Sequence, residues 1–310
     1  MNCATLNAKE PLRSLFPSTN PPTGGDNMLW PSVAPSGADF YGSDAIPGWK
    51  NSLLTSCLKG GRIMRTQLDA TGNTIIPTAG GDTVTYFRSI NRFRDVAISP
   101  DGKNIFAIID SSATTSGPTT TNPMISGCPG CLQRYTFLGY NDNAGASTIS
   151  NTIPIAPGVS NSLTNGTTIT IDGTNNNLWV PITDSLGNII TEIDANGNNL
   201  GTVTSSLYKN NGLIRKSSGG TPYMDRSMTI SVQTQPTTPV SVRLYFTTTE
   251  LNDLVGASGS TVTGLSNVVV YKNTDATSTN LIAVPTSITP SAVISKTFGS
   301  DAVVTISVNS

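Results

Sequence analysis

Residues 95–108, Asp95-Val-Ala-Ile-Ser-Pro-Asp-Gly-Lys-Asn-Ile-Phe-Ala-Ile108, decide the fold that we predict for this chain. Apolar residues flank the central Ser-Pro-Asp-Gly, in which proline fixes φ and glycine permits the positive φ of a tight turn. The stretch therefore predicts a strand, a turn and a second strand that runs from Asn104 to Ile109.

Similar short patterns extend outward from this hairpin in both directions. Near it we expect strands at 52–58, 62–68, 83–88 and 134–138, and further on at 167–171, 178–182, 189–193, 228–232, 240–246, 267–271 and 303–308. Residues 249–254 indicate one short helix. Strands separated by turn residues over the whole length predict an all-β chain.

Composition excludes several classes of function. The chain has 310 residues, of which 12% are charged, and its net charge is -1. It has no cationic block of the kind that nucleic-acid binding requires, so we expect no nucleic-acid partner. It has 0 histidines, which rules out a Ser-His-Asp triad, a His-ligated zinc site and a His base within this chain.

Four cysteines are present, at Cys3, Cys57, Cys128 and Cys131. Cys128-Pro-Gly-Cys131 lacks the second pair that a zinc knuckle needs and the following helix of a thioredoxin-like motif. We therefore expect a local disulfide or two small buried residues, and the composition is typical of exported proteins.

The ends of the chain and its apolar runs carry further expectations. No run of 18 apolar residues is present, so we expect no membrane span. Residues 1–26 are rich in Pro, Gly, Asn and Thr and predict a loop, and Met1–Pro17 lacks the apolar stretch of a signal peptide. An export-type composition without an export signal suggests a truncated start.

Several phrases between Trp30 and Asp110 resemble the soluble glucose/sorbosone dehydrogenases that use pyrroloquinoline quinone (PQQ). They are WPSVAPSGADFY, IPGWKNSLLTSCLKGGRIMRTQLD, YFRSINRFRDVAISPDGKNIFAIID and, more loosely, CPGCLQRYTF. Their order and approximate spacing match the last part of that family's domain.

The resemblance implies a six-bladed β-propeller that holds PQQ and calcium, with sugar above the cofactor. In the family a histidine base removes the hydroxyl proton while hydride moves to the quinone. Since a blade takes about 40–50 residues, residues 27–140 would form about two blades. We expect the base and the calcium ligands to lie upstream, so this chain would be a fragment with no catalytic residue of its own.

The resemblance also assigns roles to single residues. Lys59 matches a lysine that contacts PQQ, Arg92 and Arg94 match two PQQ-binding arginines, and Ser32 falls where a small hydroxyl residue lies near the cofactor. For the sugar site, Trp30 matches an aromatic residue that lines it, while Asn27 stands where a tyrosine can occur, which puts that contact in doubt. Asp110 follows the hairpin and is expected near the cleft.

The chemistry of these side chains agrees with such roles. PQQ carries three carboxylates, and arginine presents a planar fork that matches a carboxylate. Arg92 and Arg94 are two residues apart, so on a strand they would share one face while Phe93 points into the packing layer. The alternative is a solvated face on which the arginines pair with nearby carboxylates, and Trp30 merely packs in a loop.

The rest of the chain predicts a linker at 141–150 and an immunoglobulin-like β-sandwich at 151–310. The phrase GLIRKSSGGTPYMDRSMTISVQTQPTTPVSVRLYFT resembles extensions of exported enzymes of Bacteroidetes-like bacteria. We expect Asp225 and Arg226 to pair at the start of a strand. Carbohydrate binding by an exposed Trp179 or Tyr223 is a less favoured alternative.

Together these patterns predict the C-terminal part of an enzyme that oxidises an aldose at its C1 hydroxyl to a lactone. Its partners would be the sugar and an external electron acceptor, and the parent protein would be secreted, periplasmic or on the cell surface. Two alternatives stay open: a non-catalytic scaffold or adhesion module, and an inactive remnant. The three cations Lys59, Arg92 and Arg94 favour the enzyme, since a scaffold has no need of them.

Overall fold

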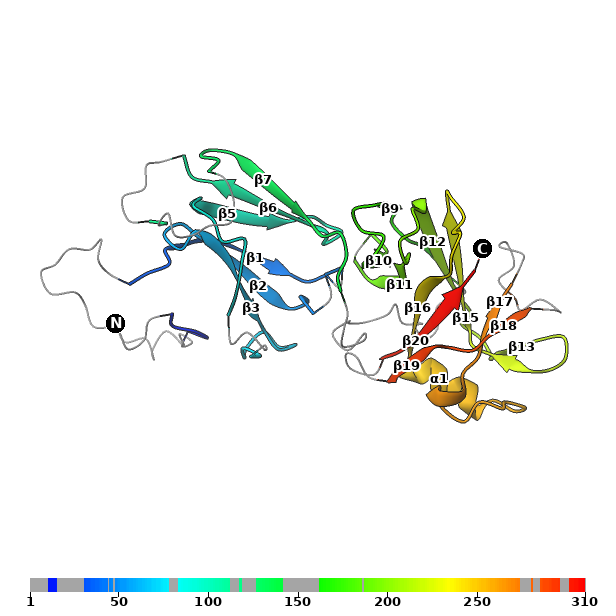
Figure 1. Cartoon of the computed structure of the whole chain (residues 1–310). Helices are drawn as coiled ribbons and strands as arrows, with labels where there is room; N and C mark the ends of the chain where they lie inside the picture. The colour runs from blue at the N-terminus through cyan, green and yellow to red at the C-terminus, as the bar shows by residue number, and fades with distance from the viewer. Residues whose placement is uncertain are drawn as a thin grey trace, which may run out of the picture. The chain divides into compact units, whose positions relative to one another are not determined.

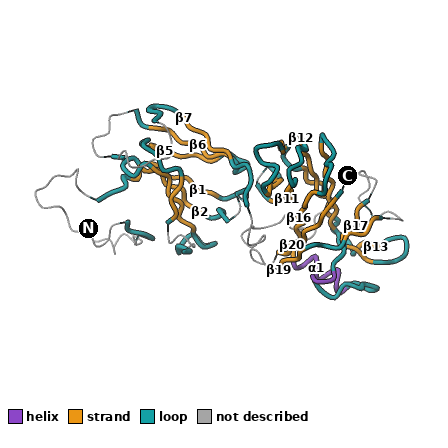
Figure 2. Tube along the Cα trace, viewed as in Figure 1, coloured by secondary structure: helices purple, strands orange, loops and turns teal. Residues whose placement is uncertain are grey.

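The chain folds into two compact units. The computed structural model describes residues 11–15, 31–43, 45–46, 48–77, 83–111, 117–118, 127–141, 162–185, 187–273, 280, 285–295 and 301–309. The N-terminal unit takes residues 1–42, 49–99 and 103–136, and the C-terminal unit takes 43–48, 100–102 and 137–310. Figure 2 shows strands and loops throughout the described chain with the helix α1 in purple, so the predicted all-β fold is confirmed.

The N-terminal unit consists of two antiparallel sheets, each of which follows the order of the chain (Figure 1). One sheet has four strands and the other has three. The first sheet is β1 (Pro35–Tyr41), β2 (Ser52–Cys57), β3 (Arg62–Gln67) and β4 (Val84–Tyr86), and the second is β5 (Phe93–Ile98), β6 (Asn104–Ile109) and β7 (Leu132–Thr136).

The hairpin β5–β6 forms as the sequence predicts. Gly102 has a φ of 73° in its turn, a conformation that glycine adopts without a steric cost. The backbone N–H of Ser99 donates to the carbonyl of Asn104 at 2.9 Å, and the N–H of Asn104 donates to the Ser99 hydroxyl at 2.8 Å. Phe93, Ile105 and Ile109 are buried, so one face of the hairpin supplies the core of the unit.

The two sheets of this unit meet through β1 and β5. The Ser36 hydroxyl donates to the carbonyl of Phe93 at 2.8 Å, and the Asp39 carboxylate accepts from the backbone N–H of Ile98 at 3.0 Å. Gly37 lies so close to Asp95 that a Cβ atom built on it would lie 2.9 Å from the Asp95 Cα. Glycine at position 37 is therefore required for the close approach of the sheets.

The C-terminal unit also has two larger sheets, in the orders β10-β11-β16-β20-β19 and β15-β12-β8, with β9 paired to β12. Two short hairpins, β13–β14 and β17–β18, accompany them. The elements are β8 (Ser162–Asn165), β9 (Ile169–Ile171), β10 (Trp179–Thr183), β11 (Ile189–Asp194), β12 (Gly201–Lys209), β13 (Arg215–Lys216), β14 (Pro222–Tyr223), β15 (Arg226–Val232), β16 (Val240–Thr247), α1 (Thr248–Gly256), a 3-10 turn (Leu265–Asn267), β17 (Val270–Lys272), β18 (Thr286–Ile288), β19 (Ala292–Ser295) and β20 (Asp301–Val308).

Both large sheets contribute to one hydrophobic core. Ile171 and Val203 come from the smaller sheet, and Val180, Ile193 and Val242 come from the larger one. All of them are buried, and burial of such side chains contributes about 1.5–3 kcal/mol each. The two sheets of this unit are therefore held together mainly by aliphatic packing.

The predicted short helix is confirmed as α1, and its first turn explains its position. The Thr247 hydroxyl accepts from the backbone N–H of Glu250, whose carboxylate accepts in turn from the N–H of Thr247. This reciprocal capping satisfies two N–H groups that a helix start leaves without partners. The expected pair of Asp225 with Arg226 is wrong, because Arg226 instead bonds Glu250 through two contacts of 2.8 Å, and Asp225 contacts Arg215.

The segment after β7 is bound within the C-terminal unit. Tyr140 exchanges backbone hydrogen bonds with Trp179 at 3.0 and 2.9 Å, and its ring lies near that of Phe137. The C-terminal unit thus takes in Phe137–Tyr140, which the sequence places before the linker. Most of the expected linker, residues 142–150, lies outside the described residues, and the domain limits remain predictions.

Candidate cofactor-binding site

Lys59 lies in the turn between β2 and β3, which the preceding segment holds in place. The backbone N–H groups of Leu58 and Gly60 donate to the carbonyls of Ala34 and Val33, each at 2.9 Å. Gly61 closes the turn with a φ of 55°. These bonds bring the turn that carries Lys59 beside the segment that contains Ser32, as a shared site requires.

Arg92 and Arg94 both contact one carboxylate oxygen of Asp110. Arg92 Nε lies 3.3 Å from Asp110 Oδ2, and Arg94 Nη2 lies 2.9 Å from the same atom. The side chains of Arg92, Arg94 and Asp110 are 14%, 52% and 9% exposed. Asp110 therefore fixes both guanidinium groups while Arg94 stays half open to solvent.

Gly117 links these arginines to Lys59. Its carbonyl accepts from Arg92 Nη1 at 2.8 Å, and a Cβ built at this glycine would lie 3.1 Å from the carbonyl oxygen of Lys59. Arg92, Gly117 and the Lys59 backbone therefore come together at one end of the sheets. Gly117 was not among the predicted site residues, because its Thr/Ser/Pro-rich surroundings contain no motif that indicates a site.

The local backbone differs from the regular strand that we expected for Arg92-Phe93-Arg94. Arg92 precedes β5, and the pairing of β5 with β6 has an irregularity between Phe93 and Asp95, where a bulge re-aims side chains. Phe93 is buried as expected. The two arginines still converge on Asp110, although they do not lie on one uninterrupted strand.

A disulfide joins Cys128 and Cys131, so the expected local bridge is confirmed. The backbone N–H of Cys128 donates to the Asn91 side chain at 2.8 Å, and the N–H of Asn91 donates to the Ser89 hydroxyl at 2.9 Å. This chain of contacts ties the disulfide loop to the residue that precedes Arg92. Asn91 is buried and was missed, because an asparagine beside an arginine in sequence usually indicates a turn.

The remaining site residues are only partly within the described chain. The Ser32 hydroxyl accepts from the backbone N–H of Ala34 at 2.8 Å, and Ala34 has a φ of 49°, which is uncommon for a residue with a Cβ. Trp30 and Asn27, expected at the sugar site, lie outside the described residues, as does Cys3. Their predicted contacts remain predictions.

The described part of this site is cationic. Arg92 and Arg94 contact the Asp110 carboxylate, and Gly117 joins Arg92 to the turn that carries Lys59. Within the described ranges no group of three or more His, Cys, Asp or Glu side chains is placed to hold a metal ion, and the expected calcium stays a prediction. The arrangement suits a ligand with several carboxylates, since arginine donates paired hydrogen bonds to such groups.

A second ionic cluster, in the C-terminal unit, surrounds Glu192 on β11. Its carboxylate accepts from the hydroxyls of Tyr245 at 2.7 Å and Tyr140 at 2.8 Å, and from Arg243 Nη1 at 3.4 Å. The Arg243 guanidinium lies 3.7 Å from the ring centroid of Trp179. Burial raises the pKa of Glu192, and these donors oppose that rise.

This cluster bears on the carbohydrate alternative. Arg243 covers one face of Trp179, and Arg215 lies 4.9 Å from the ring centroid of Tyr223. Both aromatic rings therefore have a cationic neighbour where a sugar ring would stack.

In the described chain no helix has the length and apolar character needed to cross a membrane.

Known proteins match the N-terminal part of this chain. Residues 19–116 match the family described as glucose/sorbosone dehydrogenase. The quinoprotein glucose dehydrogenase B of Acinetobacter calcoaceticus is 38% identical over an alignment of 138 residues that covers 41% of this chain. The match spans only 28% of that protein's length. The segment matched to this family contains the turn of Lys59 and the two arginines.

Proposed function

We propose that the N-terminal unit is part of a PQQ-dependent dehydrogenase that oxidises an aldose at C1. The observation that carries this proposal is the convergence of Arg92 and Arg94 on Asp110, with Gly117 linking Arg92 to the turn of Lys59. Lys59, Arg92, Arg94 and Asp110 lie inside the segment matched to the family, which ends at residue 116. The matched relative is a quinoprotein glucose dehydrogenase, which agrees with a quinone cofactor and a sugar substrate.

The donor groups fit the cofactor. Two arginines and a lysine lie at this site, and these are the side chains that pair with carboxylates such as the three of PQQ. Arg94 is 52% exposed and makes its described ion pair through Nη2, which leaves further N–H groups of its fork for a ligand. Arg92 and Arg94 would hold cofactor carboxylates, and Lys59 would place a compact charge beside a quinone oxygen.

When bound, PQQ would supply the hydride acceptor for sugar oxidation. The residues of this chain would bind and orient it. We propose that Asp110, whose carboxylate contacts both arginines, orients the guanidinium groups, which differs from the sugar contact expected for it. Trp30 and Asn27 remain the proposed sugar contacts, and Ser32 a neighbour of the cofactor.

The architecture of the parent enzyme is also part of the proposal. The two antiparallel sheets of the N-terminal unit would be neighbouring blades of a six-bladed propeller that includes residues 27–140, and residues 151–310 would form a β-sandwich extension. Calcium would bind through residues of the parent enzyme that lie upstream of this chain. The disulfide Cys128–Cys131 agrees with an exported protein, because disulfides persist in oxidising compartments.

A non-catalytic scaffold is the second candidate, and one observation favours it. Asp110 already pairs with both arginines, as expected for a solvated face whose charges satisfy one another. Under this alternative the cations stabilise the loop around Gly117 and bind no cofactor. A direct binding measurement separates the two candidates.

The test is an equilibrium titration of PQQ onto the full chain, followed by the absorbance of PQQ. We expect saturable binding that Arg94→Gln weakens by about 10-fold to 100-fold, since a hydrogen bond to a charged group contributes about 1.5–3 kcal/mol. Arg134→Gln is the matched control, because Arg134 is an exposed arginine on β7. Equal affinities of the two variants, or no saturable binding at all, would contradict the proposal.

Turnover gives a separate expectation. With PQQ, calcium and an artificial electron acceptor, these 310 residues should not oxidise glucose, because they contain 0 histidines and so lack the general base that the resemblance implies. Measurable glucose oxidation by the purified chain would show that another side chain acts as the base.

A further inference from the structure

The C-terminal unit contains a cavity of about 630 Å³ between its two large sheets. Residues of β15 line one side, and residues of β16 and β20 line the other, with β17 and β18 contributing as well. Ligand pockets in proteins usually measure about 300–1,000 Å³. This site is independent of the function proposed above.

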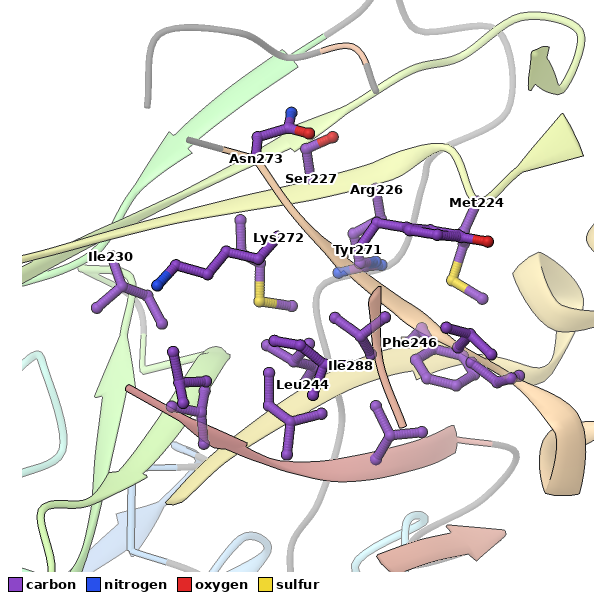
Figure 3. A pocket seen from close by; sticks show the side chains of 18 of the residues that line it. Met224, Arg226, Ser227, Ile230, Leu244, Phe246, Tyr271, Lys272, Asn273 and Ile288 are labelled. Carbon is purple, nitrogen blue, oxygen red and sulfur yellow. The ribbon is translucent and has the colours of Figure 1, made fainter. Parts of the chain in front are cut away.

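Aliphatic side chains from four strands form part of the cavity wall. Ile230, Leu244, Val270 and Ile288 line it, and all four are only partly buried although they pack on the main core. Figure 3 shows Ile230, Leu244, Ile288 and Phe246 around the hollow. Protein interiors are otherwise close-packed, and an apolar void forfeits dispersion contacts with every lining side chain. An apolar occupant would restore those contacts.

The charged side chains that line the cavity within the described residues are all positive. The described residues that line it include Arg226 and Lys272 but no Asp or Glu. Arg226 is already committed to Glu250 through two contacts of 2.8 Å, and the two side chains are 3% and 5% exposed. Lys272 is therefore the cation that a ligand could use.

Lys272 is placed at the cavity by β17. Its Nζ donates to the backbone carbonyl of Asn309 at 2.9 Å, which uses one of the three hydrogens that an ammonium group can donate. Its side chain extends along the hollow in Figure 3. An aliphatic wall with one ammonium group matches an amphiphile that has an alkyl body and an anionic head.

We propose that this cavity binds a long-chain alkyl carboxylate, with the chain between β15 and β16 and the carboxylate at Lys272. The alkyl chain would bury the exposed faces of Ile230, Leu244 and Ile288. The carboxylate would receive a charge-assisted hydrogen bond. The C-terminal unit is thus a binding module for a fatty-acid-like ligand.

The test measures the binding of dodecanoate and of its neutral counterpart dodecanol to the delipidated full chain, by calorimetry and native mass spectrometry. We expect one dodecanoate per chain, bound more tightly than dodecanol. Lys272→Met keeps most of the aliphatic stem and removes the charge, so it should weaken dodecanoate binding by about tenfold, which is about 1.4 kcal/mol, and leave dodecanol binding unchanged.

Lys216→Met is the matched control, because the Nζ of Lys216 also donates to a backbone carbonyl, that of Ser258, at 2.9 Å, and Lys216 does not line the cavity. Lys216→Met should bind dodecanoate with the same affinity as the unaltered chain. Leu244→Trp should fill the hollow and weaken the binding of both dodecanoate and dodecanol. If Leu244→Trp does not fold, the Lys272→Met measurement alone tests the proposal.

Three outcomes would overturn the proposal. They are the absence of saturable binding by the unaltered chain, equal affinities for dodecanoate and dodecanol that Lys272→Met does not change, and an equal loss of dodecanoate binding in Lys216→Met and Lys272→Met.

Discussion

The two units use the same pair of side chains, arginine and carboxylate, in opposite ways. In the N-terminal unit Asp110 contacts two arginines, one of which is 52% exposed. In the C-terminal unit the Arg243 and Glu192 side chains are 5% and 0% exposed, and two tyrosines and a tryptophan surround them. The open cluster can still meet a ligand, whereas the closed one can only stabilise the fold.

The largest expected effect comes from breaking the closed cluster. Arg243→Met leaves Glu192 buried without its cation, and removal of one partner from a buried pair costs about 3–5 kcal/mol. Hydrogen exchange of the amides of β11 and β16, followed by mass spectrometry, reports this loss within the C-terminal unit. Because the chain has two units, a local measurement is preferable to a single unfolding midpoint.

Arg94→Met in the open cluster is the comparison for that experiment. An exposed ion pair contributes about 0–1 kcal/mol, so exchange of the β5 and β6 amides should change little. Similar losses in the two variants would show that the open cluster is as important to stability as the closed one.

A side chain at Gly37, where the two sheets approach closely, should lower stability by less than Arg243→Met does. A Cβ there would lie 2.9 Å from the Asp95 Cα, so Gly37→Ala should separate β1 from β5 and cost about 1–3 kcal/mol, as overpacking usually does. Gly173→Ala in the C-terminal unit is the control, because nothing lies within 4 Å of its Cβ position. Hydrogen exchange, measured at the β1 and β5 amides for Gly37→Ala and at the β9 amides for Gly173→Ala, gives the difference. Unchanged exchange in Gly37→Ala would refute the tight packing of the sheets.

A further effect concerns pH and the buried thiol of the N-terminal unit. Burial raises the pKa of Cys57 from 9.0 to about 11. Between these values the unfolded chain has lost the thiol proton while the folded chain keeps it, so the contribution of Cys57 to stability is lost as pH rises. Between pH 8 and 11 the free energy of unfolding, measured with denaturant, should fall less steeply with pH in Cys57→Ala than in the unaltered chain. Parallel curves for the two proteins would contradict the raised pKa of Cys57.

The sequence predicted those parts of the fold that carry local signals. The hairpin 95–108 was recognisable because Pro100 and Gly102 fix its turn. The short helix was expected at 249–254, and the capping box of Thr247 and Glu250 explains where α1 begins. The strand β12 was missed, although it is the centre of its sheet. Its sequence, GTVTSSLYK, has small polar residues in the middle, and only pairing with β15 and β8 makes it a strand.

The ionic sites depend on contacts that sequence cannot show. Glu192 lies in IITEID, which predicts a strand with an outward-facing glutamate, but β11 is paired on both sides and buried. Its partner Arg243 is 51 residues away. Isoleucines occupy both faces of this strand, and this pattern was the available signal that Glu192 is buried. For Arg92 and Arg94 the family resemblance named the residues, and the structure added Gly117 and the orienting contact of Asp110.

The attachment of Tyr140 has a consequence for proteolysis. Tyr140 is bonded to Trp179 and Glu192, and Ser162 begins β8, which pairs with β12. Both ends of the stretch 141–161 are therefore anchored in the same unit. A single peptide-bond cleavage within that stretch would yield two polypeptides that remain associated, and they would separate on a denaturing gel but elute together from a native sizing column.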